Sequence, residues 1–304
     1  MARPLKVGVQ LPEVERVVRW PELRRMAETA EGIGLDSVWV GDHLLYRGDG
    51  QPARGPWEAW TTLAALAAVT QQVEIGPLVA STSFHNPAMI AKQAATLDEI
   101  SGGRLVLGLG AGWNEVEYRA FGFPFDRRVS RFEEAFTIIR TLLREGRCDF
   151  HGTFFDLADC ELVPRGPRPA GPPLLVGSEG ERMLSITLPH VDAWNAWFTW
   201  FGNTADGYRP LREKVDVACR AAGRDPAKVA RTLALFVSFP GAQGRQLGDL
   251  AEAEADPISG EPAILAAALR AFAAEGVSHV QLVLDPITVD TIAALEPALA
   301  LLDA

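Results

Sequence analysis

Two adjacent titratable residues, Asp42 and His43, directly follow the apolar run at 37–41. A short continuous apolar run of this kind is typical of a strand that is buried on both faces. Histidine titrates near neutral pH, and a neighbouring carboxylate can tune its pKa, so this pair could transfer protons in catalysis. Position alone leaves two other interpretations open, because Asp42 could cap the next helix and His43 could be a packed core residue.

Glycines and small residues follow three other apolar runs. Small side chains at 80–83 would let a flat ligand approach the backbone, and the glycines at 108–112 leave similar space beside Trp113. The stretch GSEGER at 177–182 opens a predicted helix, whose free N–H groups favour an anion such as a phosphate, with Arg182 assisting. An ordinary turn between a strand and a helix is the alternative for this last segment.

The stretch WNAWFTWFGN, residues 194–203, is unusually rich in aromatic side chains. We expect Trp194 and Trp197, together with Trp113, to form an apolar surface against a bulky or ring-shaped substrate. Core packing or a subunit interface would account for the same aromatic residues equally well.

Three carboxylates, Asp42, Glu58 and Glu115, lie in expected loops and leave a paired-carboxylate glycoside hydrolase open. Glu58 is a second acid–base candidate, although an exposed residue before a helix is an equally simple interpretation.

The sequence lacks the motifs of several other classes of enzyme. The five histidines are scattered without HxH or HExxH spacing, so we predict no metal site. The sequence also has no GxSxG motif and no phosphate-binding P-loop.

The composition narrows the class of protein. The chain of 304 residues has a formal net charge of −10, which argues against a nucleic acid or an anionic membrane as partner. Charged residues interrupt every long apolar stretch, so we expect no transmembrane helix. The N-terminus lacks a signal-peptide pattern and the three cysteines lack CxxC spacing. We therefore expect a cytoplasmic protein with free thiols.

Strand patterns alternate with helix patterns along the chain, which predicts a parallel sheet closed into a (β/α)8 TIM barrel. The expected strands lie at 5–11, 37–41, 73–78, 104–110, 173–177, 191–195, 233–239 and 279–284. The expected helices lie at 20–33, 57–70, 86–100, 128–145, 180–188, 206–222, 262–275 and 289–302. A doubly wound open sheet is the alternative, but no GxGxxG follows the first strand.

Barrel enzymes place their active sites at the C-terminal ends of the strands, where the residues named above are expected to lie. We expect a single domain over 1–304 with two insertions, at about 146–172 and 240–260. The second insertion is acidic and rich in glycine, which suits a mobile lid.

Several motifs, in order along nearly the whole chain, resemble the luciferase-like flavin and deazaflavin oxidoreductase family. They are SVWVGDHL, the segments at 55–70, 84–125, 172–184 and 191–195, and the final segment at 260–286. The segment at 84–125 is the most specific and looks like the branch that uses the deazaflavin coenzyme F420. The resemblance implies a TIM barrel, usually a homodimer, that transfers a hydride between F420 and a small organic substrate. The alternative is a monooxygenase that uses reduced FMN from a separate reductase, and a glycoside hydrolase or a non-catalytic cofactor-binding protein is a third possibility.

The resemblance also assigns roles to individual residues. It places Asp42 and His43 beside the cofactor ring, with His43 as proton donor or anion stabiliser. The segment Val79, Ala80 and Ser81 matches a bulge behind the ring that often holds a non-proline cis peptide. The loop Gly110, Ala111, Gly112, Trp113 and Asn114 matches the one along the ring or tail, and Gly177, Ser178, Glu179, Gly180 and Arg182 match the loop for the tail phosphate. Trp113 stands where a sugar-phosphate dehydrogenase branch of the family has a glutamate that it uses as an acid.

Overall fold

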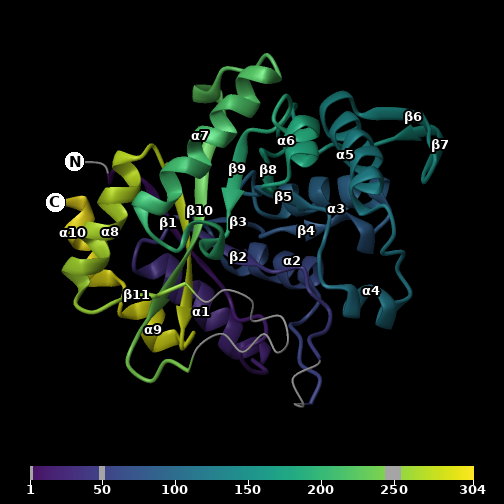
Figure 1. The fold of residues 1–304 in the computed structure, drawn as a ribbon. Coiled ribbons are helices and arrows are strands. Elements are labelled where there is room, and N and C mark those ends of the chain that lie inside the picture. Colours follow the sequence, from purple (N-terminus) through teal and green to yellow (C-terminus); the bar gives the residue numbers. More distant parts are fainter. Residues whose placement is uncertain (1–2, 48–51, 244–254) are drawn as a thin grey trace.

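Parallel strands alternate with helices in the computed structural model, which describes residues 3–47, 52–243 and 255–304 (Figure 1). The principal strands are β1 (Lys6–Gln10), β2 (Ser37–Val40), β3 (Glu74–Pro77), β5 (Leu107–Gly110), β8 (Leu174–Gly177), β9 (Ala193–Ala196), β10 (Ala230–Ser238) and β12 (His279–Asp285). Their order in the sheet is β3-β2-β1-β12-β10-β9-β8-β5, and the short strand β4 (Ala80–Ser81) follows β5.

The two ends of this sheet also meet, which closes the barrel. The backbone N–H of Ile75 in β3 donates to the carbonyl of Arg104 at 3.1 Å, and the N–H of Val106 donates back to the Ile75 carbonyl at 2.9 Å. All pairings among the principal strands are parallel, so the C-terminal ends of the strands lie at one end of the barrel. The predicted (β/α)8 barrel is confirmed.

Helices surround the barrel close to their predicted positions (Figure 1). They are α1 (Trp20–Gly32), α2 (Ala59–Val69), α3 (Pro87–Ile100), α5 (Arg128–Glu145), α6 (Glu181–Thr187), α7 (Ala205–Ala221), α8 (Pro262–Ala274), α9 (Val289–Ala293) and α10 (Glu296–Asp303), with 3₁₀ turns at Thr82–Phe84, Phe198–Phe201 and Pro226–Lys228. None of the helices in the described ranges is long and apolar enough to cross a membrane.

Two features of the helices differ from the sequence prediction. The expected closing helix at 289–302 is divided into α9 and α10, because Pro297 has no N–H to donate to the carbonyl of Ala293 and its ring would clash with that carbonyl in a continuous helix. A further short helix, α4 (Glu115–Phe121), lies in what was expected to be a loop. Helix α4 contributes the side chain of Glu117 to the cavity described below.

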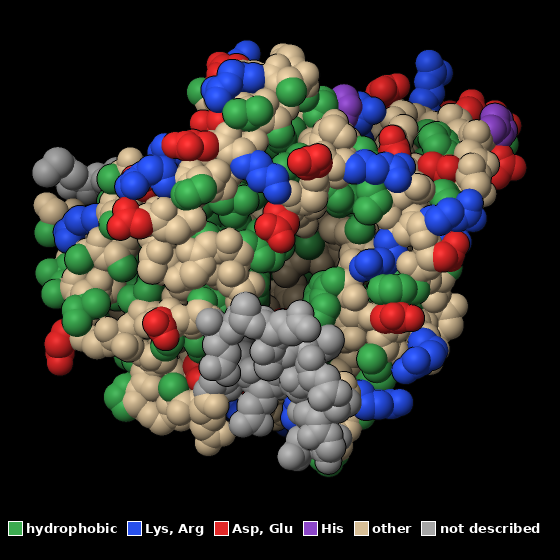
Figure 2. Space-filling model, viewed as in Figure 1, with side chains coloured by type: hydrophobic (Ala, Val, Ile, Leu, Met, Phe, Trp, Pro, Cys, Tyr) green, Lys and Arg blue, Asp and Glu red, His purple; other side chains and the backbone are tan. Residues whose placement is uncertain are grey.

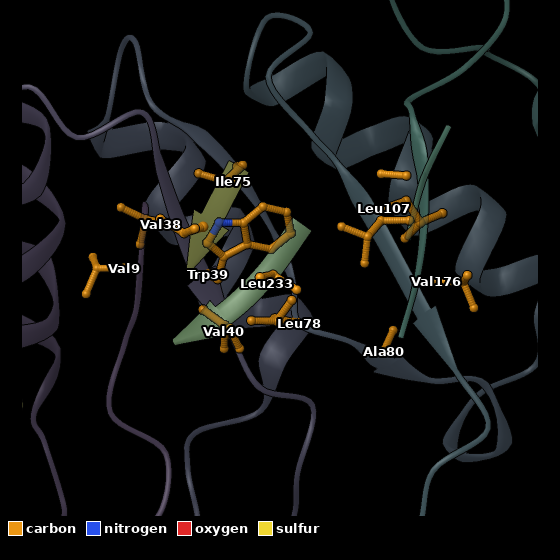
Figure 3. Close-up of a cluster of buried hydrophobic side chains, with 14 of the residues drawn as sticks. Val9, Val38, Trp39, Val40, Ile75, Leu78, Ala80, Leu107, Val176 and Leu233 are labelled. Atoms are coloured by element: carbon orange, nitrogen blue, oxygen red, sulfur yellow. The ribbon is translucent and has the colours of Figure 1, made fainter. Parts of the chain in front are cut away.

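The barrel interior is filled by large apolar side chains from several strands. Trp39 of β2 is fully buried, and Figure 3 shows it among buried side chains that include Ile75, Leu78 and Leu233. Its indole N–H donates to the Ser37 hydroxyl at 2.7 Å, so the polar atom of this large ring is satisfied inside the core.

The insertion at 146–172 contains regular structure that the sequence analysis did not predict. Strands β6 (Arg147–His151) and β7 (Asp156–Glu161) form an antiparallel two-stranded sheet, here called the hairpin, which extends beyond α5 in Figure 1. Most of the predicted lid at 240–260 lies outside the described residues. Within it, the short strand β11 (Ile258–Ser259) pairs with β10.

Candidate active site

A cavity of about 520 Å³ opens at the C-terminal ends of the strands, and Figure 2 shows a hollow near the centre of this face. The structure places most of the predicted site residues around it. Those that line the cavity are Asp42, His43, Val79, Ser81, Gly110, Ala111, Gly112, Trp113, Asn114, Gly177, Ser178, Glu179, Gly180 and Trp197. The side chains singled out from separate strand ends therefore face one common space.

Two of the residues that line the cavity, Leu78 and Val79, are joined by a non-proline cis peptide. The cis peptide that the resemblance implied is confirmed at this position. Val79 lies against the ends of two neighbouring strands. A Cβ added at Gly110 would come within 2.7 Å of a Val79 methyl group, and one added at Gly177 within 3.3 Å. Glycine at both positions thus leaves room for the Val79 side chain at the cavity.

His43 lies between two carboxylates at the edge of the cavity. Its Nδ1 atom is 2.7 Å from Glu117 Oε1, and its Nε2 atom is 3.3 Å from Glu13 Oε1. The side chain of His43 is 18% exposed, whereas those of Glu13 and Glu117 are 5% and 0% exposed. The imidazole therefore reaches the cavity while both of its carboxylate partners are buried behind it.

Each carboxylate is held by further hydrogen bonds. Glu117 accepts from the Leu44 backbone N–H at 2.5 Å and from the Asn114 amide at 2.5 Å. Glu13 accepts from the Tyr46 hydroxyl at 2.5 Å. The other oxygen of Glu13 accepts from the Gln10 amide at 2.8 Å. These bonds fix the positions of both carboxylates and hence the orientation of the imidazole.

The surroundings of His43 raise its pKa above the ordinary value. Burial alone would lower this pKa, but the charge of Glu13 and the hydrogen bond and charge of Glu117 more than offset it, and Asp42 adds to the effect. The imidazole therefore keeps its proton at higher pH than a free histidine does. A group of this kind can hold a proton at the cavity edge near neutral pH.

The carboxylate of Asp42 bonds to residues other than His43, although Asp42 and His43 are adjacent in sequence. Its Oδ2 atom accepts from the Ser81 backbone N–H at 2.9 Å and lies 3.2 Å from His85 Nε2. Asp42 thereby joins the end of β2 to β4, and it influences His43 through its charge rather than through a hydrogen bond.

Four predicted site residues lie outside the cavity lining, and three of them have other hydrogen-bond or ion-pair partners. Glu58 is exposed and caps α2, because its side chain accepts from the N–H groups of Trp60 and Thr61 at 3.0 and 2.7 Å. The assignment of Glu58 as an acid–base group is therefore corrected to a helix cap. Ala80 is fully buried in the core.

The predicted roles of Trp194 in substrate binding and of Arg182 in cofactor binding are corrected as well. Trp194 is fully buried and its indole N–H donates to the Ser178 carbonyl at 2.7 Å, so it supports the cavity loop from behind instead of facing a substrate. Arg182 pairs with Glu133 at 2.8 Å, where both side chains are about half exposed. The core interpretation of the aromatic stretch holds for Trp194, whereas Trp197 lines the cavity.

Trp113 stands beside His43 on the open side of the cavity. Its ring centroid lies 5.5 Å from that of His43 in a T-shaped arrangement, and the side chain is 46% exposed. Tyr46 lies 5.0 Å from His43 on another side. The imidazole is thus bordered by aromatic rings, which form an apolar surface next to the proton-bearing group.

The sequence analysis missed the residues that define the charge of the site. They are the charged residues Glu13, Glu117 and Arg128, together with Tyr46 and Gln10, which hydrogen-bond to Glu13. The Arg128 guanidinium lies 4.0 Å above the Phe125 ring and donates to the Gly112 carbonyl at 2.7 Å. It is the one arginine or lysine among the cavity-lining residues that the structure describes.

Two buried acceptors at the cavity have no hydrogen-bond partner in the described part of the chain, namely Gln10 Oε1 and Asn114 Oδ1. Buried polar atoms normally find partners, so these atoms are suited to N–H or O–H donors of a bound molecule. Within the described ranges, no cluster of three or more His, Cys, Asp or Glu side chains has the arrangement of a metal site.

The model of the luciferase-like monooxygenase family matches residues 6–243. The chain belongs to this family. Among curated relatives of this luciferase-like protein, the F420-dependent glucose-6-phosphate dehydrogenase of Amycolatopsis mediterranei is 37% identical over 182 residues, 58% of this chain and 52% of the relative. The pyrimidine monooxygenase RutA of Cronobacter sakazakii is 33% identical over 173 residues, 55% of this chain and 50% of the relative. The chain thus spans about half the length of the curated relatives it matches.

Solved structures with low sequence identity share the whole fold. An F420-dependent secondary alcohol dehydrogenase, in complex with an F420–acetone adduct, superposes with a TM-score of 0.83 at 19% identity over 99% of both chains. A riboflavin lyase superposes with a TM-score of 0.80 at 17% identity, over 98% of this chain and 91% of the other. The luciferase-like protein is an enzyme of this class, and its relatives include F420-dependent enzymes and monooxygenases.

Proposed function

We propose that this luciferase-like enzyme transfers a hydride between F420 and a small organic substrate. The observation that carries the proposal is the position of His43 at the cavity edge, held between Glu13 and Glu117 with its pKa raised. Moving a hydride to or from an oxygen-bearing carbon also requires that one proton be delivered or removed. The F420-dependent dehydrogenase among the relatives supports the same reading.

The residues present fit a flat ring with a phosphate-bearing tail. The surface made by Val79 between Gly110 and Gly177 would contact the ring, and the free acceptors on Gln10 and Asn114 would receive its N–H groups. When bound, F420 would supply or accept the hydride. The protein itself contributes orientation and the proton.

Arg128, rather than the predicted Arg182, would hold the tail phosphate. Arg128 lines the same cavity as Ser178 and Gly180, whereas Arg182 pairs with Glu133 on the surface. Arginine matches the geometry of phosphate oxygens and keeps its charge at any physiological pH.

The Nε2 atom of His43 would exchange the proton. Nδ1 is held firmly by Glu117 at 2.7 Å, whereas the contact of Nε2 with Glu13 is longer, at 3.3 Å. The nitrogen with the weaker contact is the one whose proton can pass more readily to a substrate oxygen. Trp113 and Trp197 on the cavity surface suit a substrate that is apolar or planar.

The second candidate is a monooxygenase that uses reduced FMN supplied by a separate reductase, which the RutA relatives favour. Titration of the purified protein with F420 and with FMN, each oxidised and reduced, tests the proposal through absorbance and fluorescence. We expect tighter binding of F420. Preferential binding of FMN would favour the monooxygenase, and binding of neither would contradict both. Sedimentation of the same sample tests the homodimer that the resemblance implies.

A further inference from the structure

Two free cysteines face each other across the hairpin. In the ladder between β6 and β7, Cys148 is the direct partner of Cys160. Directly opposed residues of an antiparallel pair project from the same face, with Cβ atoms about 4.5–5.5 Å apart. A disulfide needs a Cβ separation of about 3.5–4.5 Å. We propose that these two thiols form a redox pair that hydrogen peroxide converts into an intrachain disulfide.

The backbone around the pair can make the small approach that the bond requires. The sheet contains only β6 and β7, so a shift of one strand disturbs no other ladder among the described residues. The pairing register changes just beyond Cys148, where Asp159 adopts a left-handed conformation with φ of 51°. This bulge adds one residue to β7 and locally disrupts the ladder next to Cys160, while the Asp159 N–H donates to the Asp149 carboxylate of β6 at 2.6 Å.

Burial distinguishes the two thiols. Cys148 is 6% exposed and belongs to the core, whereas Cys160 is only partly buried. Burial raises the pKa of the Cys148 thiol, and the neighbouring Cys160 adds to this effect. Cys160 is therefore the sulfur that peroxide reaches first, and Cys148 is the nearby thiol that completes the reaction.

The reaction balances with peroxide as the oxidant. The Cys160 thiolate attacks one oxygen of hydrogen peroxide, the O–O bond breaks, and a sulfenic acid and hydroxide form. The Cys148 sulfur then attacks the sulfenic sulfur, the S–O bond breaks, and the Cys148 proton leaves with the oxygen as water. One peroxide is reduced to two waters while two thiols are oxidised to one disulfide.

The hairpin that carries this pair is attached to the helix that contributes Arg128 to the cavity. Glu134 of α5 accepts from the backbone N–H groups of Thr153 and Phe154 at the hairpin tip, at 2.8 and 2.9 Å. The guanidinium groups of Arg127 and Arg131 lie 4.6 and 4.4 Å from the Phe154 ring. A cross-link between the two strands would therefore fix a segment that packs on the first turns of α5.

The test uses the full-length purified protein. The reduced protein is treated with equimolar hydrogen peroxide, its remaining thiols are alkylated, and tryptic peptides are weighed. Both cysteines lie in one tryptic peptide, 148–165, and Cys219 lies in another. We expect peptide 148–165 to become two hydrogens lighter and to take no alkyl group. Dithiothreitol before alkylation should restore two alkylation sites.

Single cysteine-to-serine variants test whether the cross-link joins Cys148 to Cys160 or involves Cys219. Cys219→Ser should leave the cross-link intact, because this fully buried cysteine lies on α7. Cys148→Ser and Cys160→Ser should each abolish it, and circular dichroism verifies that the variants fold. The proposal is overturned if peptide 148–165 still takes two alkyl groups, if Cys160 gains two oxygens while Cys148 stays free, or if the disulfide joins two chains or involves Cys219.

Discussion

Glu117 Oε1 lies 2.7 Å from Nδ1 of His43, although 74 residues separate the two in sequence. Because the Glu117 side chain is fully buried and also accepts from the Leu44 N–H, it cannot turn away from the imidazole without losing both bonds. Glu117 is therefore a positioning residue that fixes the ring and leaves Nε2 toward the cavity and Glu13.

Glu117→Gln should lower the pKa of His43 and move the alkaline limb of the pH–rate profile to lower pH. A hydrogen bond to a charged group contributes about 1.5–3 kcal/mol, which corresponds to about one to two pH units. In the direction of substrate reduction the protonated imidazole is the active form, so a lower pKa of His43 removes this form at lower pH. The measurement is kcat/KM against pH.

Glu115→Gln on the same short helix is the matched control, because Glu115 is exposed. It should leave the profile in place. An unchanged profile in the Glu117 variant, with the fold intact, would mean that the charge of this carboxylate does not tune His43.

His43→Ala should slow turnover by about 10²–10⁴-fold, the usual contribution of a general acid or base. Affinity for the cofactor should change much less, because most of the cavity surface is made by other residues. Stopped-flow measurement of hydride transfer, with cofactor affinity measured separately, separates the two effects. His151→Ala is the control, since this histidine is exposed on the hairpin. Equal losses of rate and affinity would show that His43 only shapes the cavity.

Much of the barrel could be predicted because its buried strands have a strong local signature. The apolar runs at 37–41 and 173–177 correspond to β2 and β8, and α5 begins and ends at its predicted residues. Asp42 and His43 could be placed at a strand end for the same reason. Parallel strands of a closed barrel bring all such ends together, so residues from distant segments could be assigned to one site.

The site residues that escaped prediction depend on facts that only the folded chain shows. Glu115 and Glu117 lie on different faces of α4, so the first is exposed and the second is buried against His43. The sequence predicts Glu58 as a loop carboxylate, because the hydrogen bonds by which it caps the start of α2 are visible only in the structure. Arg128 and Arg182 both lie near a predicted helix start, and only their partners show which one faces the cavity.

Gly110→Ala should weaken cofactor binding. The added methyl group would lie 2.7 Å from a Val79 methyl carbon, which is closer than carbon atoms pack, so Val79 must move into the cavity. We expect affinity to fall by about 5- to 150-fold, which corresponds to about 1–3 kcal/mol for overpacking. Gly32→Ala is the control, because nothing lies within 4 Å of its added Cβ. Unchanged affinity at Gly110→Ala would show that the ligand does not contact Val79.

Arg128→Met should reduce affinity for a phosphate-bearing cofactor by about tenfold to a hundredfold, the effect of losing one hydrogen bond to a charged group. Arg182→Met should have little effect, since its guanidinium pairs with Glu133 on the surface. Cofactor fragments with and without the phosphate, titrated into both variants, locate the contact. A larger loss at Arg182→Met would restore the assignment made from the sequence.

The free energy of unfolding should fall as the pH drops from about 6.5 toward 3, in part because of His279. Burial lowers the pKa of this imidazole to about 3, and its Nε2 atom lies 2.7 Å from the Ser37 hydroxyl. The unfolded chain binds a proton near its ordinary pKa of about 6.5, so within this window protons favour unfolding by up to about 1.4 kcal/mol per pH unit. Above about pH 6.5 the imidazole is neutral in both the folded and the unfolded chain, so the contribution of His279 to the free energy of unfolding no longer changes with pH.

Urea denaturation at a series of pH values measures this dependence. His279→Gln removes the titrating group, so its stability curve should be flatter than that of the parent between pH 3 and 6.5, whatever its stability at neutral pH. Removal of the exposed His151, as His151→Gln, is the control for loss of a histidine elsewhere. If the His279 variant and the parent have the same slope, the imidazole titrates in the folded protein as it does in the unfolded chain, and the buried contact with Ser37 does not exclude its proton.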